Sequence, residues 1–179
     1  MDWYTIVKFL HVASAVIWIG GGLIMVLLGV KADRAKNDAE LVGVVRQVAW
    51  AADRIYVPAS IATLIFGVTA AWLGSLWSNL WVNLGFVGIV STIALGVLVL
   101  TPRAKKVAAE DGVTAKAVAV SREILTIAKF DMTVLFVVIA DMVLKPDLND
   151  WGWLVAFAVV IVAAAALWLA PVLSKPATA

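Results

Sequence analysis

Cysteine is absent from this chain of 179 residues, and histidine occurs only once. Without thiols the chain forms no disulfide, iron–sulfur cluster or thiolate zinc site, and the redox compartment stays open. No phosphate-binding loop and no Ser/His/Asp signature is visible either. Charge is scarce as well: 15% of the residues are charged, against about a quarter in a soluble domain. The formal net charge of +2 is too small to indicate nucleic acid as a partner.

Hydrophobic residues take the place of the missing charges. They make up 64% of the chain, and the mean hydropathy is +1.02. These values predict an integral membrane protein whose main partner is the lipid bilayer. At this length we expect one transmembrane domain over residues 1–179 and not several domains. The expected fold class is all-α, a polytopic helical bundle.

Apolar runs of bilayer-spanning length occur five times. We expect transmembrane helices at residues 5–30, 55–77, 80–100, 127–144 and 151–172. The fourth run is the shortest, and it carries two acidic residues, Asp131 and Asp141.

The segments between these runs alternate in charge. The segments after the first and third runs are basic, whereas the second has no basic residue and the fourth has one Lys and two acids. The positive-inside rule therefore predicts an outside amino terminus and an inside carboxy terminus. The basic side chains are Lys31, Arg34, Lys36, Arg46 and Arg54 in the first segment, and Arg103, Lys105, Lys106, Lys116, Arg122 and Lys129 in the third.

Both basic segments also carry apolar residues at helical spacing, such as Leu41, Val44, Val45 and Val48. Two interpretations stay open. The segments lie on anionic headgroups, or they extend the neighbouring spans beyond the membrane. Tyr56 is expected near the inner membrane interface, where aromatic rings are favoured.

The one histidine lies inside the first predicted span. His11 and Trp18 are seven residues apart, which is two helical turns, so they share one helix face. An imidazole at membrane depth is a ligand for haem iron or copper, or a group that transfers protons. The alternative is a hydrogen bond across helices beside a glycine packing seam. The sequence leaves both interpretations open.

The two intramembrane acids have different expected roles. Asp141 is predicted at about the depth of His11, where it orients the imidazole or neutralises a cation; the alternative is a pair with Lys145 at i,i+4. Asp131 is interpreted as a headgroup-level residue near Lys129.

Two further side chains belong to the candidate site. Lys8 is one turn from His11, although its stem is also long enough to reach the outer headgroups. Met142 adjoins Asp141 and offers a soft thioether to haem iron or Cu(I), or fills a packing gap. The predicted cofactor-binding residues are His11, Trp18, Met142, Asp141 and Lys8, with His11 as the metal ligand.

The motif Lys8-Phe9-Leu10-His11, with Trp18-Ile19-Gly20-Gly21 after it, resembles the opening span of copper-resistance-protein-D-like membrane proteins. It is also similar to membrane-bound protoporphyrinogen oxidases and to the membrane portion of certain bacterial urate oxidases. A family of small bacterial integral membrane proteins is closer still. Its second span begins like Val57-Pro58-Ala59, and its fourth ends like Met142-Val143-Leu144-Lys145-Pro146. The resemblance covers about the first 146 residues, so the fifth span is an addition.

This resemblance implies a location in the bacterial cytoplasmic (inner) membrane. In the protoporphyrinogen oxidase group the first-span histidine is implicated in haem binding, and only His11 carries over. The resemblance therefore implies haem b, or a related redox ligand, at His11 near the outer face. The alternatives are a non-catalytic accessory subunit of a larger complex and a copper transport component. Self-association or a partner complex is expected, and enzymatic activity is left open.

Overall fold

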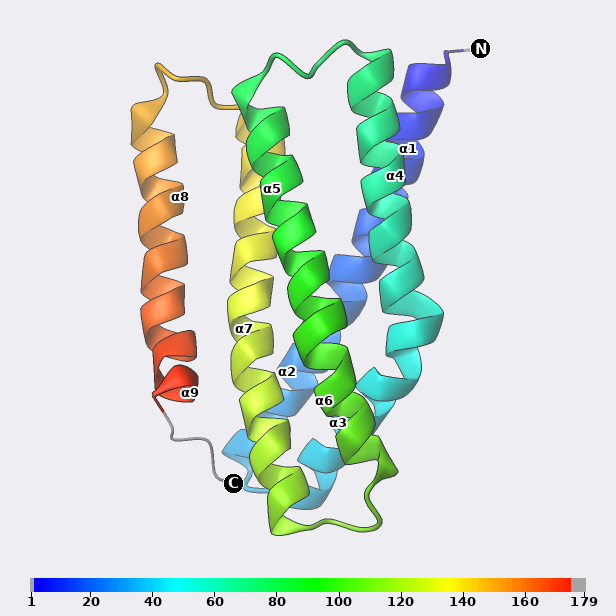
Figure 1. Ribbon diagram of the computed structural model, residues 1–179, viewed down its shortest axis with the longest axis vertical. Coiled ribbons are helices and arrows are strands. Elements are labelled where there is room, and N and C mark those ends of the chain that lie inside the picture. Colours follow the sequence, from blue (N-terminus) through cyan, green and yellow to red (C-terminus); the bar gives the residue numbers. More distant parts are fainter. Residues whose placement is uncertain (1, 175–179) are drawn as a thin grey trace.

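The computed structural model describes residues 2–174, and every regular element within this range is a helix (Figure 1). Three long rods each consist of two α-helices joined by a π-helical turn. The first rod contains α1 (Trp3–Ala15), the turn Val16–Gly20 and α2 (Gly21–Arg34). The second rod contains α3 (Asp38–Ala51), the turn Ala52–Tyr56 and α4 (Val57–Leu73). The third rod contains α5 (Leu80–Leu95), the turn Gly96–Leu100 and α6 (Thr101–Ala109).

Two more rods complete the bundle. The helix α7 (Ala115–Leu144) is unbroken over 30 residues. The last rod contains α8 (Trp151–Ala164), the π-helical turn Ala165–Leu169 and the short α9 (Ala170–Leu173).

Four rods are long and apolar enough to cross a membrane: Trp3–Arg34, Asp38–Leu73, Leu80–Ala109 and Trp151–Leu173. The helix α7 is not in this set, although its length is sufficient, because its apolar part carries three charged residues, Lys129, Asp131 and Asp141. Helices dominate because a bilayer offers no water to unpaired backbone groups, and a helix satisfies its own.

The helical rods extend beyond the predicted apolar runs, except at the end of the second run. That run was expected to reach residue 77, but α4 ends at Leu73 because Ser75 has a φ of 51°, which breaks the helix. Polar side chains cap three helix starts by accepting backbone N–H bonds. The caps are Asp2 for Tyr4, Asn37 for Glu40 and Thr114 for Ala117.

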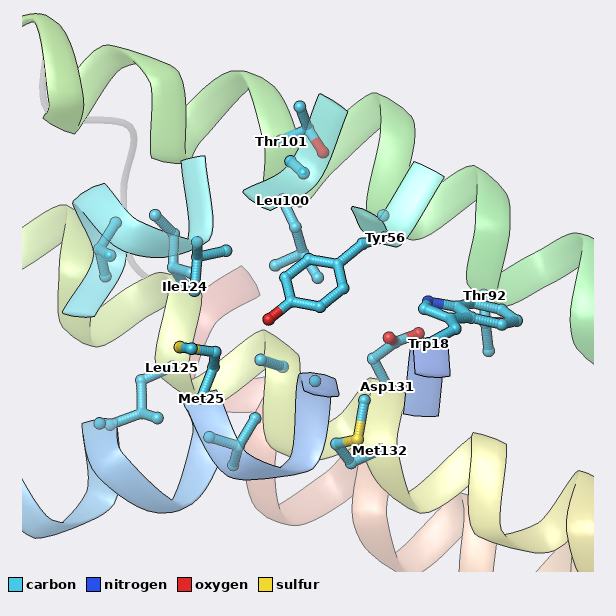
Figure 2. Close-up of a pocket in the computed structure, with 18 of the residues that line it drawn as sticks. Trp18, Met25, Tyr56, Thr92, Leu100, Thr101, Ile124, Leu125, Asp131 and Met132 are labelled. Carbon is cyan, nitrogen blue, oxygen red and sulfur yellow. The ribbon is translucent and has the colours of Figure 1, made fainter. Parts of the chain in front are cut away.

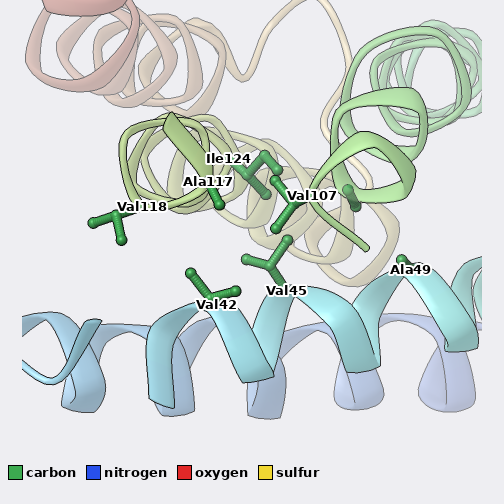
Figure 3. Close-up of a cluster of buried hydrophobic side chains, with 8 residues drawn as sticks. Val42, Val45, Ala49, Val107, Ala117, Val118 and Ile124 are labelled. Carbon is green, nitrogen blue, oxygen red and sulfur yellow. The ribbon is translucent and has the colours of Figure 1, made fainter. Parts of the chain in front are cut away.

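At the end of the bundle opposite the amino terminus, α3, α6 and α7 close around a small apolar core (Figure 3). Val42, Val45, Val107 and Ala117 are buried there. The first basic segment therefore extends its span as a packed helix and does not present its apolar face to headgroups. Burial of this apolar surface holds the three helices together.

Ion pairs tie the same end together. Arg122 donates to Asp33 at 3.0 Å and to Asp38 at 2.8 Å, which links α7 to α2 and α3. Arg46 donates to the carbonyl oxygens of Glu110 and Gly112 at 2.8 and 2.7 Å. Exposed pairs of this kind each contribute little stability, about 0–1 kcal/mol. Their main consequence is that these arginines bind the protein itself and not lipid.

Near the amino terminus the rods pack in pairs. The helix α1 packs on α4, and α5 packs on α7. The last rod stands at the edge of the bundle and packs mainly on α7 (Figure 1). Ala164 is the one buried residue that α8 contributes.

Candidate functional site

His11 faces α4 and makes one hydrogen bond across the helices. Its Nδ1 lies 2.8 Å from the backbone carbonyl oxygen of Thr63. A carbonyl only accepts, so Nδ1 carries a proton and donates it. In the neutral ring Nε2 is then the free acceptor, because only one ring nitrogen holds a proton. The predicted interhelical hydrogen bond is therefore present.

The imidazole rests on the backbone of Gly67, one turn after Thr63. A Cβ at position 67 would lie 2.9 Å from both Cε1 and Nδ1 of His11. Carbon atoms do not approach this closely without displacement, so the site requires glycine. The contact is a close α1–α4 packing seam, as the second interpretation of His11 predicted.

Trp18 lies on the same side of its rod. It is 8% exposed and packs in one cluster with Ala59, which is one turn before Thr63 on α4. The common face of His11 and Trp18 is confirmed, since both residues meet α4. The π-helical turn Val16–Gly20 follows α1 and contains Trp18.

The other predicted site residues are not gathered around His11. Lys8 is exposed, and its Nζ lies 5.1 Å from the centre of the Tyr4 ring. Met142 lies against α5, where its methyl group fills the space beside Gly85. Asp141 also faces Gly85, whose Cβ position would be 3.3 Å from the carboxylate.

The alternative interpretation of Asp141, a pair with Lys145, is wrong. Lys145 ends α7 in a left-handed conformation with a φ of 51°. Its N–H still donates to the carbonyl oxygen of Asp141 at 2.8 Å, but its side chain leaves the backbone in a different direction from that of a helical residue. Its Nζ lies 5.4 Å from the centre of the Trp81 ring. Asp141 is 3% exposed, and neither carboxylate oxygen has a hydrogen-bond partner among the described residues.

The expected headgroup position of Asp131 is also wrong. The helix α7 begins at Ala115, much earlier than the predicted span, which places Asp131 about 24 Å along it at 1.5 Å per residue. Asp131 is 6% exposed, and its Oδ1 is buried without a hydrogen-bond partner among residues 2–174.

Asp131 lines a cavity of about 130 Å³ in the middle of the bundle, called here the inner cavity (Figure 2). Trp18 and Tyr56 line it with Asp131, as do Met25 and Met132. Three π-helical turns border this space, since each contributes lining residues. Such turns inside α-helices occur frequently at functional sites.

Tyr56 is a site residue that the sequence placed elsewhere. It is half-buried, and its hydroxyl donates to the carbonyl oxygen of Gly21 at 3.3 Å. Its ring lies against Gly21, where a Cβ would be 3.0 Å from Cε1. Its aromatic character suits an interfacial position equally well, so its inward orientation could not be predicted from the sequence.

A second space of about 650 Å³ lies between α5, α7 and α8, and is called here the α8 groove. Its lining is mainly apolar and includes both Asp131 and Asp141. Asp131 and Thr92 line the inner cavity as well, so the two spaces adjoin at these residues. Ten residues of α7 separate the two acids, about 15 Å along the helix.

Metal ligands do not cluster in the part of the chain that the structure describes: residues 2–174 contain no group of three or more His, Asp or Glu that could hold an ion. His11 lines neither the inner cavity nor the α8 groove. The polar chemistry therefore divides into the imidazole of His11 on α1, which is hydrogen-bonded to α4, and two carboxylates on α7 that have oxygen atoms without a partner among the described residues.

Comparison with known proteins gives one match. The profile of a family described as predicted integral membrane protein (DUF2269) matches residues 5–146, well over half of the chain. The match ends before α8, as the resemblance over the first 146 residues predicted. No curated protein and no solved structure matches. The resemblance to the copper-resistance and protoporphyrinogen oxidase groups finds no support in these comparisons.

The single histidine makes the His11–Thr63 bond directly measurable. We expect ¹⁵N NMR of the imidazole to show the tautomer protonated at Nδ1, because that nitrogen donates to a carbonyl. Gly67→Ala should displace the ring, broaden this signal and lower the free energy of unfolding by about 1–3 kcal/mol.

Gly43→Ala is the matched control, because no atom lies within 4 Å of its Cβ position. This substitution in a helix interior should instead stabilise by about 0.5–1 kcal/mol. A native imidazole protonated at Nε2, or equal effects of the two substitutions, would contradict the assignment.

Proposed function

We propose that this chain, which belongs to the predicted integral membrane protein family DUF2269, is a transport component that passes protons or other small cations through the bundle by way of Asp131 and Asp141. One observation carries the proposal. Asp131 lies where the inner cavity meets the α8 groove, with a carboxylate oxygen that no described residue satisfies.

Unpaired carboxylates are expensive in an apolar interior. Such a group is retained where it exchanges a proton or binds a cation, and acids at membrane depth mark ion and proton pathways. Neither Asp131 nor Asp141 has a Lys or Arg partner among the described residues. The balancing charge must therefore come from outside the chain. A Cu(I) cargo would also use the thioethers of Met25 and Met132, which line the inner cavity.

The two spaces extend in opposite directions from Asp131. The inner cavity reaches Val48 and Ile124, towards the end that holds the ion pairs. The α8 groove reaches Leu80 and Leu148, near the α4–α5 and α7–α8 connections. A cation that moves between them would pass Asp131 and then Asp141.

The proposal includes five spans in the bacterial inner membrane, with the amino terminus outside. The helix α7 is about 45 Å long and lies beside α5, so it has the length to cross a hydrocarbon core of about 30 Å. Neither Asp131 nor Asp141 contacts lipid, because both side chains are buried in the bundle. The basic connections α2–α3 and α6–α7 would face the cytoplasm.

Reporter fusions test this orientation. A reporter active only outside the cytoplasm should be active after Asn79, and one active only inside should be active after Asp111, because the basic segments stay inside. The opposite pattern would reverse the topology.

Proton movement tests the transport role. Vesicles of phosphatidylethanolamine and phosphatidylglycerol that contain the protein and a trapped pH dye should acidify when a potassium diffusion potential is imposed, negative inside. Asp131→Asn and Asp141→Asn should each reduce the rate to that of empty vesicles, because an amide keeps the shape but cannot exchange the proton.

Asp53→Asn is the matched control for this measurement. Asp53 is exposed and pairs with Lys105 at 2.7 Å, outside both spaces. This variant should acidify at the native rate. Native protein that behaves like empty vesicles, or unchanged rates in both buried-acid variants, would overturn the proposal.

Haem b at His11 is a second candidate, favoured by the hydrogen bond from Nδ1. Histidines that ligate metals usually donate their other nitrogen to a carbonyl or carboxylate, which leaves Nε2 as the ligand. The residues of one chain fit a single axial bond but not a haem pocket, because His11 lines neither described space. A haem would have to lie between two copies, with one His11 from each.

An absorption spectrum tests this second candidate. If haem is held, protein purified from haem-replete cells shows a Soret band, and His11→Ala loses it while the bundle stays folded. A native protein without the band, or a variant that retains it, would remove haem from consideration.

The accessory-subunit alternative is favoured by the last rod. Large apolar side chains such as Trp151, Val162 and Leu167 are exposed on it. Lipid covers such a face, and so would a partner helix or a second copy. Co-purification of a stoichiometric second chain, with no proton movement, would favour this alternative.

A further inference from the structure

The inner cavity has the size of a compact organic molecule. Its volume is about 130 Å³, and an engineered apolar cavity of about 150 Å³ in another protein binds benzene. A ligand of six or seven non-hydrogen atoms, roughly the size of benzene, therefore fits without a rearrangement of the helices.

The lining of this cavity has the composition of a site for an organic cation. Asp131 supplies negative charge, and its Oδ1 is buried without a partner among the described residues. Trp18 and Tyr56 add aromatic rings around the same space, as Figure 2 shows. Aromatic rings attract cations through their negative faces, most strongly for Trp. Among residues 2–174, no Lys or Arg lines the cavity.

Other occupants suit the cavity less well. A purely apolar molecule would leave the Asp131 carboxylate unsatisfied, at a cost of several kcal/mol. Divalent cations such as Ca²⁺ take about six to eight oxygen ligands, and the lining offers one carboxylate and a few hydroxyls. A small ammonium ion with methyl groups meets both demands, because its charge faces the carboxylate and its methyl groups face the rings.

We propose that the inner cavity binds a small organic ammonium ion, with its charge beside Asp131 and its alkyl groups against Trp18 and Tyr56. The proposal rests on the proposed function and names the class of cation that is carried. Asp141 is outside this binding site, because it lines only the α8 groove.

Choline and 3,3-dimethylbutan-1-ol are the probes. The two have the same shape, but a carbon atom replaces the charged nitrogen in the alcohol. Calorimetric titration of the full chain in maltoside micelles should show choline binding, with the alcohol weaker by about tenfold or more, because only the cation pairs with the carboxylate.

Variants locate the binding. Asp131→Asn should lower the affinity for choline by about tenfold or more, since the charge partner is lost. Trp18→Phe keeps an aromatic ring, but one that attracts cations less strongly, and should lower the affinity for choline by about threefold to tenfold. Asp141→Asn should bind choline as the native protein does. Size-exclusion elution and helical circular dichroism confirm that each variant is folded.

The outcomes separate the two proposals. Equal binding of choline and the alcohol, or unchanged choline affinity in folded Asp131→Asn, would overturn the ammonium site. Proton movement without choline binding would also overturn it and leave the transport role in place. Choline binding in a protein that moves no protons would keep the site and overturn proton transport. Full support requires Asp141→Asn to stop proton movement while it retains choline affinity.

Discussion

A polar group without a partner is costly inside a membrane, and this cost governs the arrangement of the bundle. Backbone groups avoid it by forming helices. His11 avoids it by donating to the Thr63 carbonyl, which in turn requires the close approach that Gly67 permits. Tyr56 avoids it by donating to Gly21. In each case the hydrogen bond joins the first rod to the second, so that the polar groups of the first two spans also set the packing of these spans.

Asp131 and Asp141 do not follow this rule, and the spaces around them indicate why. Each is buried on α7 with at least one carboxylate oxygen that no described residue satisfies, and each lines a cavity or groove that the neighbouring rods leave open. The π-helical turns Val16–Gly20 and Ala52–Tyr56 bring Trp18 and Tyr56 to the inner cavity. The buried polar groups without a partner among the described residues therefore lie on α7, whereas the imidazole of His11 is hydrogen-bonded to α4.

The sequence predicted what depends on local periodicity. The helical class, the apolar runs and the common face of His11 and Trp18 follow from residue spacing and composition. The burial of Asp131 did not follow, because it depends on how the neighbouring rods pack around α7, which residue spacing along one helix does not show. The free carboxylate of Asp141 depends on the left-handed conformation of Lys145, which the i,i+4 rule does not anticipate. The inward orientation of Tyr56 depends on a glycine 35 residues earlier in the chain.

Reaction with dicyclohexylcarbodiimide would measure whether Asp131 is the acid that binds a ligand in the inner cavity. This apolar reagent modifies carboxylic acids within membranes, and mass spectrometry identifies the modified residues. We expect modification of Asp131 and Asp141, with choline protecting Asp131 alone. Modification confined to aqueous acids such as Asp111, or equal modification of Asp131 with and without choline, would show that Asp131 does not bind the ligand.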